Sequence, residues 1–404
     1  MEVKVGFKQT ELGFVPDGWN LIPIEKIADQ ARKWSFTGGP FGSNLKSSDY
    51  TQDGVRVIQL QNIGDGVFHN DSQIYTSPEK ANELISCNIY PNEIILSKMG
   101  DPVARAAIIP NFHDRYLMCS DGIRLSVNTK EHNNYFIFLS INFNYFRKQA
   151  ESASTGSTRK RIGLSELRQL KVICPKFDEQ NSIAEALSDA DTLIESLENL
   201  IEKKRQIKQG AMQELLSGKK RLAGFSGEWV EKPLGEICHI KTGNRNNQDK
   251  VEDGQYPFFV RSSTVERINS YSHDCEAILI PGEGGIGSIF HYILGKFDVH
   301  QRVYAITQFP KDVCGKYIYL YMNVHFGFHA MQNSVKATVD SLRLPTFLEF
   351  KINLPPTKDE QEAIAEILSD MDLELTKLDS KLTKARQIKQ GMMQDLLTGK
   401  IRLV

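Results

Sequence analysis

The polar segment 154–161, which reads STGSTRKR, is the densest group of side chains that could bind a ligand. It places Thr158 directly before Arg159, Lys160 and Arg161. Backbone amides and hydroxyl groups in such a loop can approach phosphates, and guanidinium groups can reach phosphates or the edge of guanine. The alternative is a run of solvated surface charge. The segment therefore predicts a contact with nucleic acid.

Amide side chains form a second group. The Gly-rich segment 37–46 ends with Asn44 and Lys46, and Gln61 and Asn62 follow a β-rich run. Asn and Gln can bind adenine through two hydrogen bonds in the major groove. The same residue types are also ordinary at turns and strand ends. Both interpretations stay open for this group.

The second half of the chain has candidates at the matching places. These are Arg245, Asn246, Asn247, Arg261, Lys336 and Thr338. The last two take the place of the Arg-Lys-Arg cluster of the first half. This departure leaves the phosphate contact of the second half open.

The segment 282–287, GEGGIG, matches the G-x-G-x-x-G pattern of dinucleotide sites. Such a site needs a helix N-terminus next, to hold the pyrophosphate. The following residues, SIFHYIL, are β-branched and aromatic, so a tight turn is the better prediction. The sequence contains no nucleophile elbow, Walker loop, metal-ligand cluster or recognisable pair of catalytic carboxylates. We therefore expect the chain to catalyse no reaction by itself.

An internal repeat indicates the elements that must position these loops. Segments 178–222 and 359–403 align without a gap at an offset of 181 residues (359 − 178), and 26 of the 45 paired positions are identical. A repeat at fixed period over this length implies two related halves. Each half consists of a globule followed by one copy of the segment.

The repeated segment predicts a long helix. In the second copy apolar residues follow a 4-3 spacing from Ile364 to Ala385, as in the seam of a coiled coil. Prolines precede each copy, and Gly218 and Gly399 follow its last apolar pair at positions suited to ending a helix. We expect helices of about 38 residues that pair antiparallel. Parallel helices, or separate packing on each globule, are the alternatives.

The globules open with similar segments, 13–28 and 224–238, in which Trp19 aligns with Trp229. Short β-rich runs separated by Gly, Asn, Asp and Pro clusters predict mixed structure, and the aromatic runs 136–146 and 317–328 predict helices that pack in the core. The expected fold class is α+β, with two mixed α/β globules separated by an antiparallel coiled coil and related by a pseudo-twofold axis. The expected boundaries are 1–177, 178–222, 223–358 and 359–404.

The composition sets further bounds. The formal net charge is −1, so any nucleic-acid surface must be local. The six cysteines include no CxxC pair, so we expect neither a metal site nor a disulfide framework. The sequence has no apolar run of membrane-spanning length and no signal-peptide core at its start. We expect a cytoplasmic protein that does not contact membrane.

Two divergent globules, each followed by a helix that starts E-Q-x-x-I-A and ends L-L-(S/T)-G-K, resemble the specificity subunit of a type I restriction-modification system. Segments 38–50 (GGPFGSNLKSSDY) and 96–109 (LSKMGDPVARAAII) add to this resemblance. It covers nearly the whole chain. The paired helix motif is specific, whereas the globule motifs alone would be weak.

The resemblance implies that each globule is a target-recognition domain for one half of a split site on double-stranded DNA. The helices would set the spacer and dock two methyltransferase subunits, and restriction subunits would join the complex. S-adenosylmethionine would belong to the methyltransferase subunits and ATP to the restriction subunits, with no cofactor in this chain. The alternatives are a stand-alone two-domain enzyme and a coiled-coil scaffold that binds only proteins.

Overall fold

The computed structural model describes residues 6–157, 159–333 and 341–403. The chain divides into two compact units. Unit 1 comprises Met1–Ser196 and Thr383–Val404, and unit 2 comprises Leu197–Leu382. Each unit thus contains one globule and part of both long helices. No helix in the described ranges has the length and apolar character needed to cross a membrane.

The globule of unit 1 is built on two small sheets. One has the order β10-β9-β12-β4 and the other β5-β7-β6-β11-β8, with two-stranded pairs β1-β2 and β13-β3 beside them. The strands are β1 (Phe7–Thr10), β2 (Gly13–Pro16), β3 (Asn20–Pro23), β4 (Phe36–Gly38), β5 (Tyr50–Thr51), β6 (Val55–Ile58), β7 (Ile74–Thr76), β8 (Asn88–Ile89), β9 (Ile94–Ser97), β10 (Ala106–Ile108), β11 (Tyr116–Met118), β12 (Gly122–Leu125) and β13 (Lys171–Cys174).

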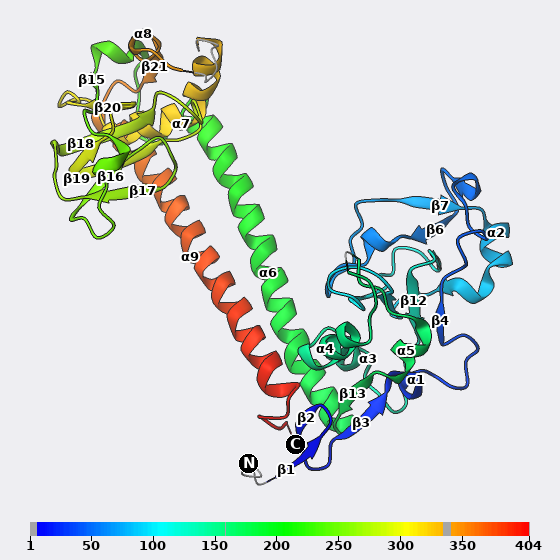
Figure 1. Ribbon diagram of the computed structural model, residues 1–404. Helices are drawn as coiled ribbons and strands as arrows, with labels where there is room; N and C mark the ends of the chain where they lie inside the picture. The colour runs from blue at the N-terminus through cyan, green and yellow to red at the C-terminus, as the bar shows by residue number, and fades with distance from the viewer. Residues whose placement is uncertain (1–5, 158, 334–340, 404) are drawn as a thin grey trace. The chain divides into compact units, whose positions relative to one another are not determined.

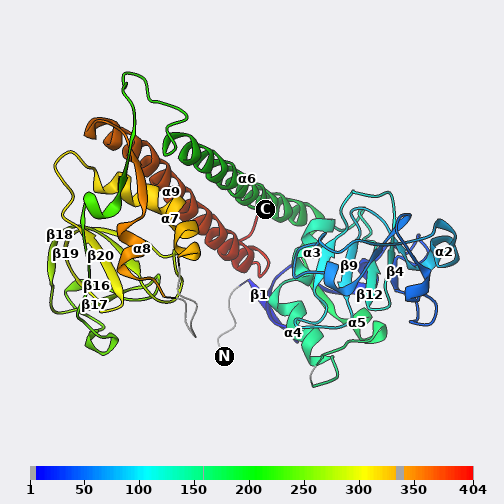
Figure 2. The same ribbon diagram turned by 90° about the horizontal axis from the view of Figure 1, so that it is seen from above.

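Short helices complete this globule. They are α1 (Ile24–Ile27), α2 (Pro78–Glu83), α3 (Asn134–Ile141), α4 (Asn144–Ser152) and α5 (Leu164–Gln169). Figure 2 shows α3 beside the sheet that contains β9 and β12. Strands β6, β9 and β12 are buried along their whole length, including Arg56 of β6 and Arg124 of β12. The segments that follow β4, β6 and α4 carry the candidate residues of this globule.

The globule of unit 2 contains one six-stranded sheet of order β15-β20-β18-β19-β16-β17 and the pair β14-β21. Its elements are β14 (Val230–Pro233), β15 (His239–Thr242), β16 (Tyr256–Phe259), β17 (Val265–Ile268), β18 (His273–Pro281), β19 (His291–Val299), β20 (Val303–Thr307), β21 (Lys351–Leu354), α7 (Gly315–Gln332) and α8 (Leu344–Leu348). In both units the aromatic runs are helical, as predicted, and their Phe136, Phe146, Tyr317 and Phe326 side chains are buried.

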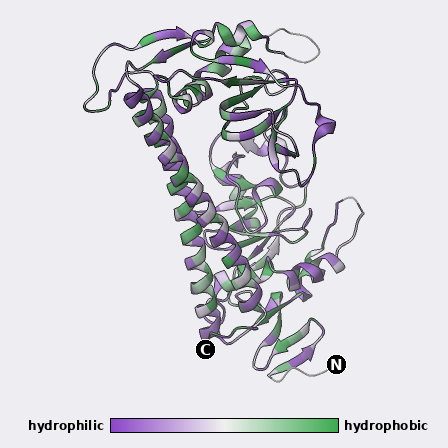
Figure 3. Ribbon diagram, turned by 90° about the vertical axis from the view of Figure 1, so that its left-hand side faces the viewer, coloured by the Kyte–Doolittle hydropathy of each residue, from purple (hydrophilic) through white to green (hydrophobic). Residues whose placement is uncertain are grey.

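Helices α6 (Phe177–Leu215) and α9 (Lys358–Leu396) have 39 residues each, close to the predicted length (Figure 1). The glycines expected to end them, Gly218 and Gly399, have φ values of 71° and 66°. Polar residues colour much of both helices purple in Figure 3. Their apolar stripes are narrow, so a large part of each helix surface is hydrophilic.

The two helices run antiparallel in each unit, as predicted. In unit 2, Lys204 pairs with Glu374 and Lys208 with Asp372, so the numbers rise along one helix as they fall along the other. In unit 1, Asp191 of α6 pairs with Lys389 of α9. The Asp191–Lys389 pair is equivalent to the Asp372–Lys208 pair of unit 2, because Asp191 aligns with Asp372 and Lys208 with Lys389 in the internal repeat. The parallel alternative is therefore excluded within each unit, and the α+β fold class with two mixed globules is confirmed.

A second repeated contact ties each globule to both helices. In unit 1 the guanidinium of Arg402, just after α9, contacts the buried Glu179 at the start of α6 and lies over the Trp19 ring at 5.5 Å. Trp19 also donates its indole N–H to Glu179 at 3.1 Å. We name this arrangement the clasp. In unit 2 the clasp consists of Trp229, Glu360 and Arg221, with the arginine again over the ring but without a hydrogen bond from the buried Trp229 indole N–H.

The glutamine of each Glu-Gln motif also has a structural role. Gln180 accepts the backbone N–H of Asn133 at 3.0 Å, and Gln361 accepts that of Cys314 at 2.8 Å. Asn133 and Cys314 precede helices α3 and α7. The repeated Glu-Gln pair is therefore explained by fixing each globule to the start of its long helix.

Gly210 and Gly391 do not mark a close contact between the helices. Both are exposed, and a Cβ atom added at either would meet no atom within 4 Å.

Candidate nucleic-acid interface

The cationic segment of unit 1 lies on a tight hairpin. The backbones of Thr155 and Arg161 exchange two hydrogen bonds of 2.8 Å, which closes the loop between them. Gly156 has a φ of 97° and supplies the left-handed conformation that the turn requires. The hairpin is held to the rest of the unit because Gly100 donates its backbone N–H to the Lys160 carbonyl at 3.1 Å.

The three cations of this hairpin have different surroundings. Lys160 forms an ion pair with Glu151, and Arg161 pairs with Asp121 at 2.7 Å. The hydrogen bond from Lys160 and its charge lower the pKa of Glu151. Arg159 is exposed and takes part in none of the ion pairs formed within the described ranges. Among the three, Arg159 is therefore the cation best able to meet a phosphate. Thr158 lies outside the described residues.

Asn44 and Lys46 are exposed in the loop after β4. The backbone N–H of Asn44 donates to the Phe41 carbonyl at 2.8 Å, and that of Lys46 donates to the Asp49 carboxylate at 2.7 Å. The backbone is thus ordered by turns while both side chains face solvent. Gly39 starts this loop, and a Cβ there would lie 1.8 Å from the Cys119 carbonyl oxygen, so only glycine fits.

Gln61 and Asn62 behave differently. Gln61 is exposed beside the loop after β6. Asn62 is 1% exposed: its side-chain oxygen accepts the Gln59 N–H at 2.9 Å, and its NH₂ donates to the carbonyls of His69 and Ser72 at 2.9 and 3.1 Å. Because this amide is buried and saturated, it is not available to a base. The assignment of Asn62 as a DNA contact is corrected: the residue fixes its own loop.

In unit 2, Arg245 donates from Nε to the fully buried carboxylate of Asp298 at 3.2 Å. Asn246 accepts a hydrogen bond from Gln301 at 2.6 Å, whereas Asn247 is exposed. Arg245 and Asn246 therefore have structural contacts, and Asn247 remains free for another role. The segment with Lys336 and Thr338 lies outside the described residues.

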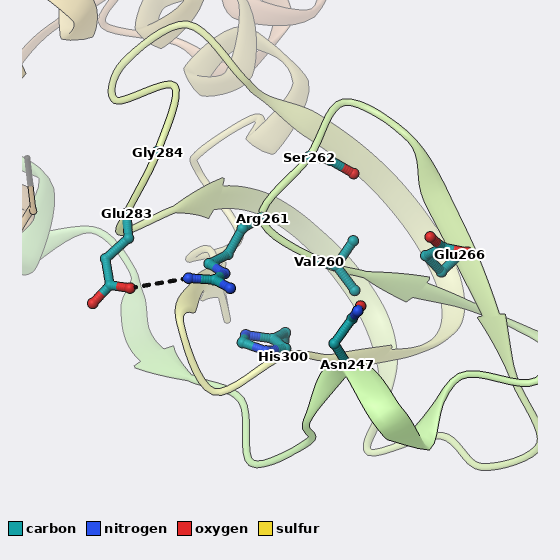
Figure 4. Close-up of a pocket in the computed structure, with 8 residues that line it drawn as sticks. All are labelled: Asn247, Val260, Arg261, Ser262, Glu266, Glu283, Gly284 and His300. Atoms are coloured by element: carbon teal, nitrogen blue, oxygen red, sulfur yellow. Dashed lines mark hydrogen bonds and ion pairs between the residues drawn. The ribbon is translucent and has the colours of Figure 1, made fainter. Parts of the chain in front are cut away.

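A depression lies beside these loops in each unit. The one in unit 1 has a volume of about 430 Å³ and is lined by residues that include Leu60, Met99, Asp101, Ser157, Arg159 and Lys160. The one in unit 2 has a volume of about 420 Å³ and is lined by residues that include Asn247, Arg261, Ser262, Glu283 and His300 (Figure 4). The depressions bring together Arg159 and Lys160 in one unit, and Asn247 and Arg261 in the other.

Three residues of unit 2 were missed from the sequence. Glu283 of the GEGGIG segment contacts both Arg261 and Arg302, at 3.3 and 3.1 Å, and His300 lines the same depression. The segment itself forms the predicted turn, and strand β19 follows it rather than a helix. A signal was present, because GEGGIG occupies the same place after a buried strand as KMGDPV of the first half.

The arrangement can bind polyanions and groups that form hydrogen bonds. The described residues contain no cluster of three or more groups that could hold a metal ion. Arg159 and Lys160 line the depression of unit 1, and Arg261 and Asn247 line that of unit 2. Such donors suit phosphate oxygens and the major-groove edges of bases.

Comparisons with known proteins agree with this chemistry. The family described as "Type I restriction modification DNA specificity domain" matches residues 46–209 and 226–386, which is more than half of the chain. The putative type I restriction enzyme MjaX specificity subunit of Methanocaldococcus jannaschii is 22% identical over 441 residues, covering 98% of this chain and 97% of that subunit.

The type I restriction enzyme EcoDI specificity subunit of Escherichia coli is 30% identical over 171 residues, or 42% of this chain. This match spans 37% of the EcoDI subunit, and a match to the MjaVIII specificity subunit of M. jannaschii spans 50% of that protein. The crystal structure of a type I restriction-modification system S subunit from M. genitalium has the same fold, with a TM-score of 0.63, 17% identity and 98% coverage of both chains. The chain therefore belongs to the family of type I restriction-modification DNA specificity domains.

Proposed function

We propose that this chain is the DNA-recognition subunit of a type I restriction-modification complex, in which each globule reads one half of a bipartite target on double-stranded DNA. One observation carries the proposal: both units present a depression at the same place in the fold, with cationic and hydrogen-bonding side chains at its edge. A duplicated module with different side chains at one place suits two different half-sites.

Contacts to phosphate and to bases would be divided among the exposed residues. Arg159 and Lys46 suit phosphates, because both are cations on exposed loops. Asn44, Gln61 and Asn247 suit base edges, because their amides are exposed and can both donate and accept. Lys160 and Arg161 would contribute less charge, since each has a carboxylate partner.

The long helices would serve as spacer and as docking surface. Their polar outer faces support partner binding, and two related halves support two methyltransferase subunits, with restriction subunits joining the complex. S-adenosylmethionine would be bound by the methyltransferase subunits and ATP by the restriction subunits. This chain would bind neither and would catalyse nothing alone. Acting on cellular DNA, the complex would work in the cytoplasm.

A module exchange tests the proposal. Residues 19–175 are replaced by the same module of a relative, and methylated sites are sequenced in cells that contain the chain with its methyltransferase partner. We expect one half of the target to change and the other to persist. The unmodified chain and a reciprocal exchange of the second module are the controls. If both halves of the target changed together, the globules would not read their half-sites independently. If the chain showed no salt-dependent binding to a specific duplex, a scaffold that binds only proteins would be favoured.

A further inference from the structure

The two depressions are built on the same backbone frame. In unit 1 the frame consists of three backbone hydrogen bonds, from Cys119 to Ile58 (2.9 Å), Lys98 to Asp121 (2.7 Å) and Ile162 to Lys98 (2.9 Å). In unit 2 the corresponding bonds run from His300 to Phe259 (3.0 Å), Gly282 to Arg302 (2.8 Å) and Leu342 to Gly282 (2.8 Å). An isolated β-bridge accompanies each frame, Met99 to Arg161 in one and Glu283 to Ser341 in the other.

These bonds define equivalent positions without any sequence alignment. Asp121 corresponds to Arg302, and Cys119 to His300, because each makes the same backbone bond. Met99 corresponds to Glu283 through the bridge. Leu60 corresponds to Arg261, since each lies two residues beyond the carbonyl of Ile58 or Phe259. All four side chains differ between the units, although the backbone does not.

In unit 2 these positions hold an Arg-Glu-Arg group. One carboxylate oxygen of Glu283 lies 3.3 Å from Nη1 of Arg261, and the other lies 3.1 Å from Nη1 of Arg302. Figure 4 shows the Arg261 guanidinium between Glu283 and the His300 ring. The arginine side chains are still 52% and 59% exposed, so each keeps donors that face outward. Glu283 therefore orients two guanidinium groups and saturates neither.

The fold does not require this group. Unit 1 builds the same frame with Leu60, Met99 and Asp121 at the three positions. Ion pairs as exposed as these also contribute little to stability. The side chains on the frame are therefore free to serve recognition.

His300 adds a fixed donor to the same depression. Its Nδ1 accepts the backbone N–H of Arg302 at 3.0 Å, which leaves the proton of a neutral ring on Nε2. Burial, followed by the charges of Arg261 and Arg302, lowers the pKa of His300 and favours that neutral ring. Within the described residues no hydrogen bond to Nε2 is formed, so this N–H can meet an acceptor.

The charge of Glu283 favours a base over a phosphate as ligand. A carboxylate beside two guanidinium groups halves their net charge and so weakens the attraction of a phosphate, and it can accept a hydrogen bond that a base can donate and a phosphate diester cannot. Guanine offers O6 and N7 to an arginine fork, and the paired cytosine offers an amino group that a carboxylate can accept. The mixed group therefore suits a G·C pair.

We propose that Arg261 and Arg302, oriented by Glu283, read a G·C pair in the half-site of unit 2, and that the side chains at the four equivalent frame positions determine the base pair accepted in each unit. This inference rests on the proposed function. It assigns Glu283 as a positioning residue that can also accept a hydrogen bond from the cytosine amino group.

Selection from randomised duplexes tests the inference, with the chain assembled with its methyltransferase partner. The variants are Glu283→Gln, which removes the charge with little change of shape, and Arg261→Lys, which keeps the charge but loses the fork. We expect the selected half-site of unit 2 to contain a G·C pair at which both variants lose roughly tenfold or more of their discrimination. The other half-site should not change. Glu231→Gln, in the exposed ion pair with Lys351, is the matched control.

The remaining outcomes are also decisive. A half-site of unit 2 without a G·C pair, or variants that weaken binding to every duplex equally, would overturn the inference and leave the proposed function standing. A wild-type complex with no preferred duplex would refute the proposed function as well. A melting temperature lowered in both variants but not in Glu231→Gln would show that the group is structural. If only Glu283→Gln fails to fold, the base preference selected by Arg261→Lys tests the inference.

Discussion

Arg221 donates two hydrogen bonds, of 2.6 and 2.8 Å, to the two carboxylate oxygens of Glu360, which is fully buried. Two parallel bonds of this kind fix both the distance and the orientation of the pair. The same pair recurs between Arg402 and Glu179, at distances of 2.5 and 2.7 Å. The clasp therefore explains the glutamate near the start and the arginine near the end of each repeated segment.

Arg221→Ala should lower the free energy of unfolding by about 2–4 kcal/mol, because it leaves the buried Glu360 carboxylate without its counter-charge. Chemical denaturation measures the effect. Lys351→Ala is the control: it removes an exposed ion pair with Glu231 and should cost much less stability, because exposed ion pairs contribute little. Equal losses for both variants would contradict a special role of the clasp.

Asp298→Asn should reduce the acid sensitivity of unit 2. Burial raises the pKa of Asp298, but hydrogen bonds from Ser270, Ser272, the Val299 N–H and Arg245 outweigh it and hold the pKa below its ordinary value of 3.8. A lowered folded-state pKa means that this contribution is complete above the unfolded-state pKa and is lost as pH falls through the folded-state value.

Stability measured between pH 7 and pH 3 checks this sign. Wild-type protein should lose stability more steeply below about pH 4 than Asp298→Asn does, and the variant should be less stable at pH 7 by on the order of 1–2 kcal/mol. The exposed Asp253→Asn is the matched control and should follow the wild type. Identical pH profiles for wild type and Asp298→Asn would rule out the lowered pKa.

Arg159→Ala should weaken DNA binding at every sequence and reduce the slope of log affinity against log salt by about 1, as expected for one lost phosphate contact. Titration of one duplex at several salt concentrations measures the slope. Lys351→Ala carries the same charge change on an exposed residue of unit 2 and should leave the slope unaltered. A change in base preference without a change in slope would assign Arg159 to a base instead.

One heptad added to both helices, after Leu200 and after Lys381, keeps the apolar seam in register and lengthens each helix by about 10 Å. If the helices set the spacer, the preferred number of unread base pairs should rise by about 1–3, with weaker affinity because the DNA also turns over that distance. Selection from duplexes with randomised spacers measures this. A heptad added to α9 alone is the control and should disrupt the packing of α9 against α6. An unchanged preferred spacer length at full affinity would show that the helices do not set the spacer.

The helices could be predicted from the sequence because the residues that specify them lie close together in the chain and recur in both halves. The apolar spacing, the prolines and the terminal glycines each constrain a few neighbouring residues. The aromatic run 136–146 was less fully predicted. It is interrupted because the Asn142 side chain bonds both the N–H and the carbonyl of Ala106, which lies far away in sequence.

The candidate site was predicted at the level of loops but not of side chains. Asn62 could not be recognised as buried, since its burial depends on the chain returning at His69 and Ser72. Glu283 was hidden in a glycine motif with a familiar pattern. Its partner Arg302 belongs to a separate connection between strands, so only the folded frame reveals their contact.

Unit 1 is completed by residues that are synthesised after all of unit 2. Leu396 and Leu397 belong to its hydrophobic core, and Arg402 closes its clasp. As the chain leaves the ribosome, 197–382 is therefore available to fold while the N-terminal globule still lacks part of its core. Unit 2 can therefore complete its packing before unit 1 does, which reverses the usual N-to-C order of domain folding. A chain that ends after unit 2 has emerged, but before Thr383–Val404 has, would leave the first globule, rather than the second, exposed to proteolysis.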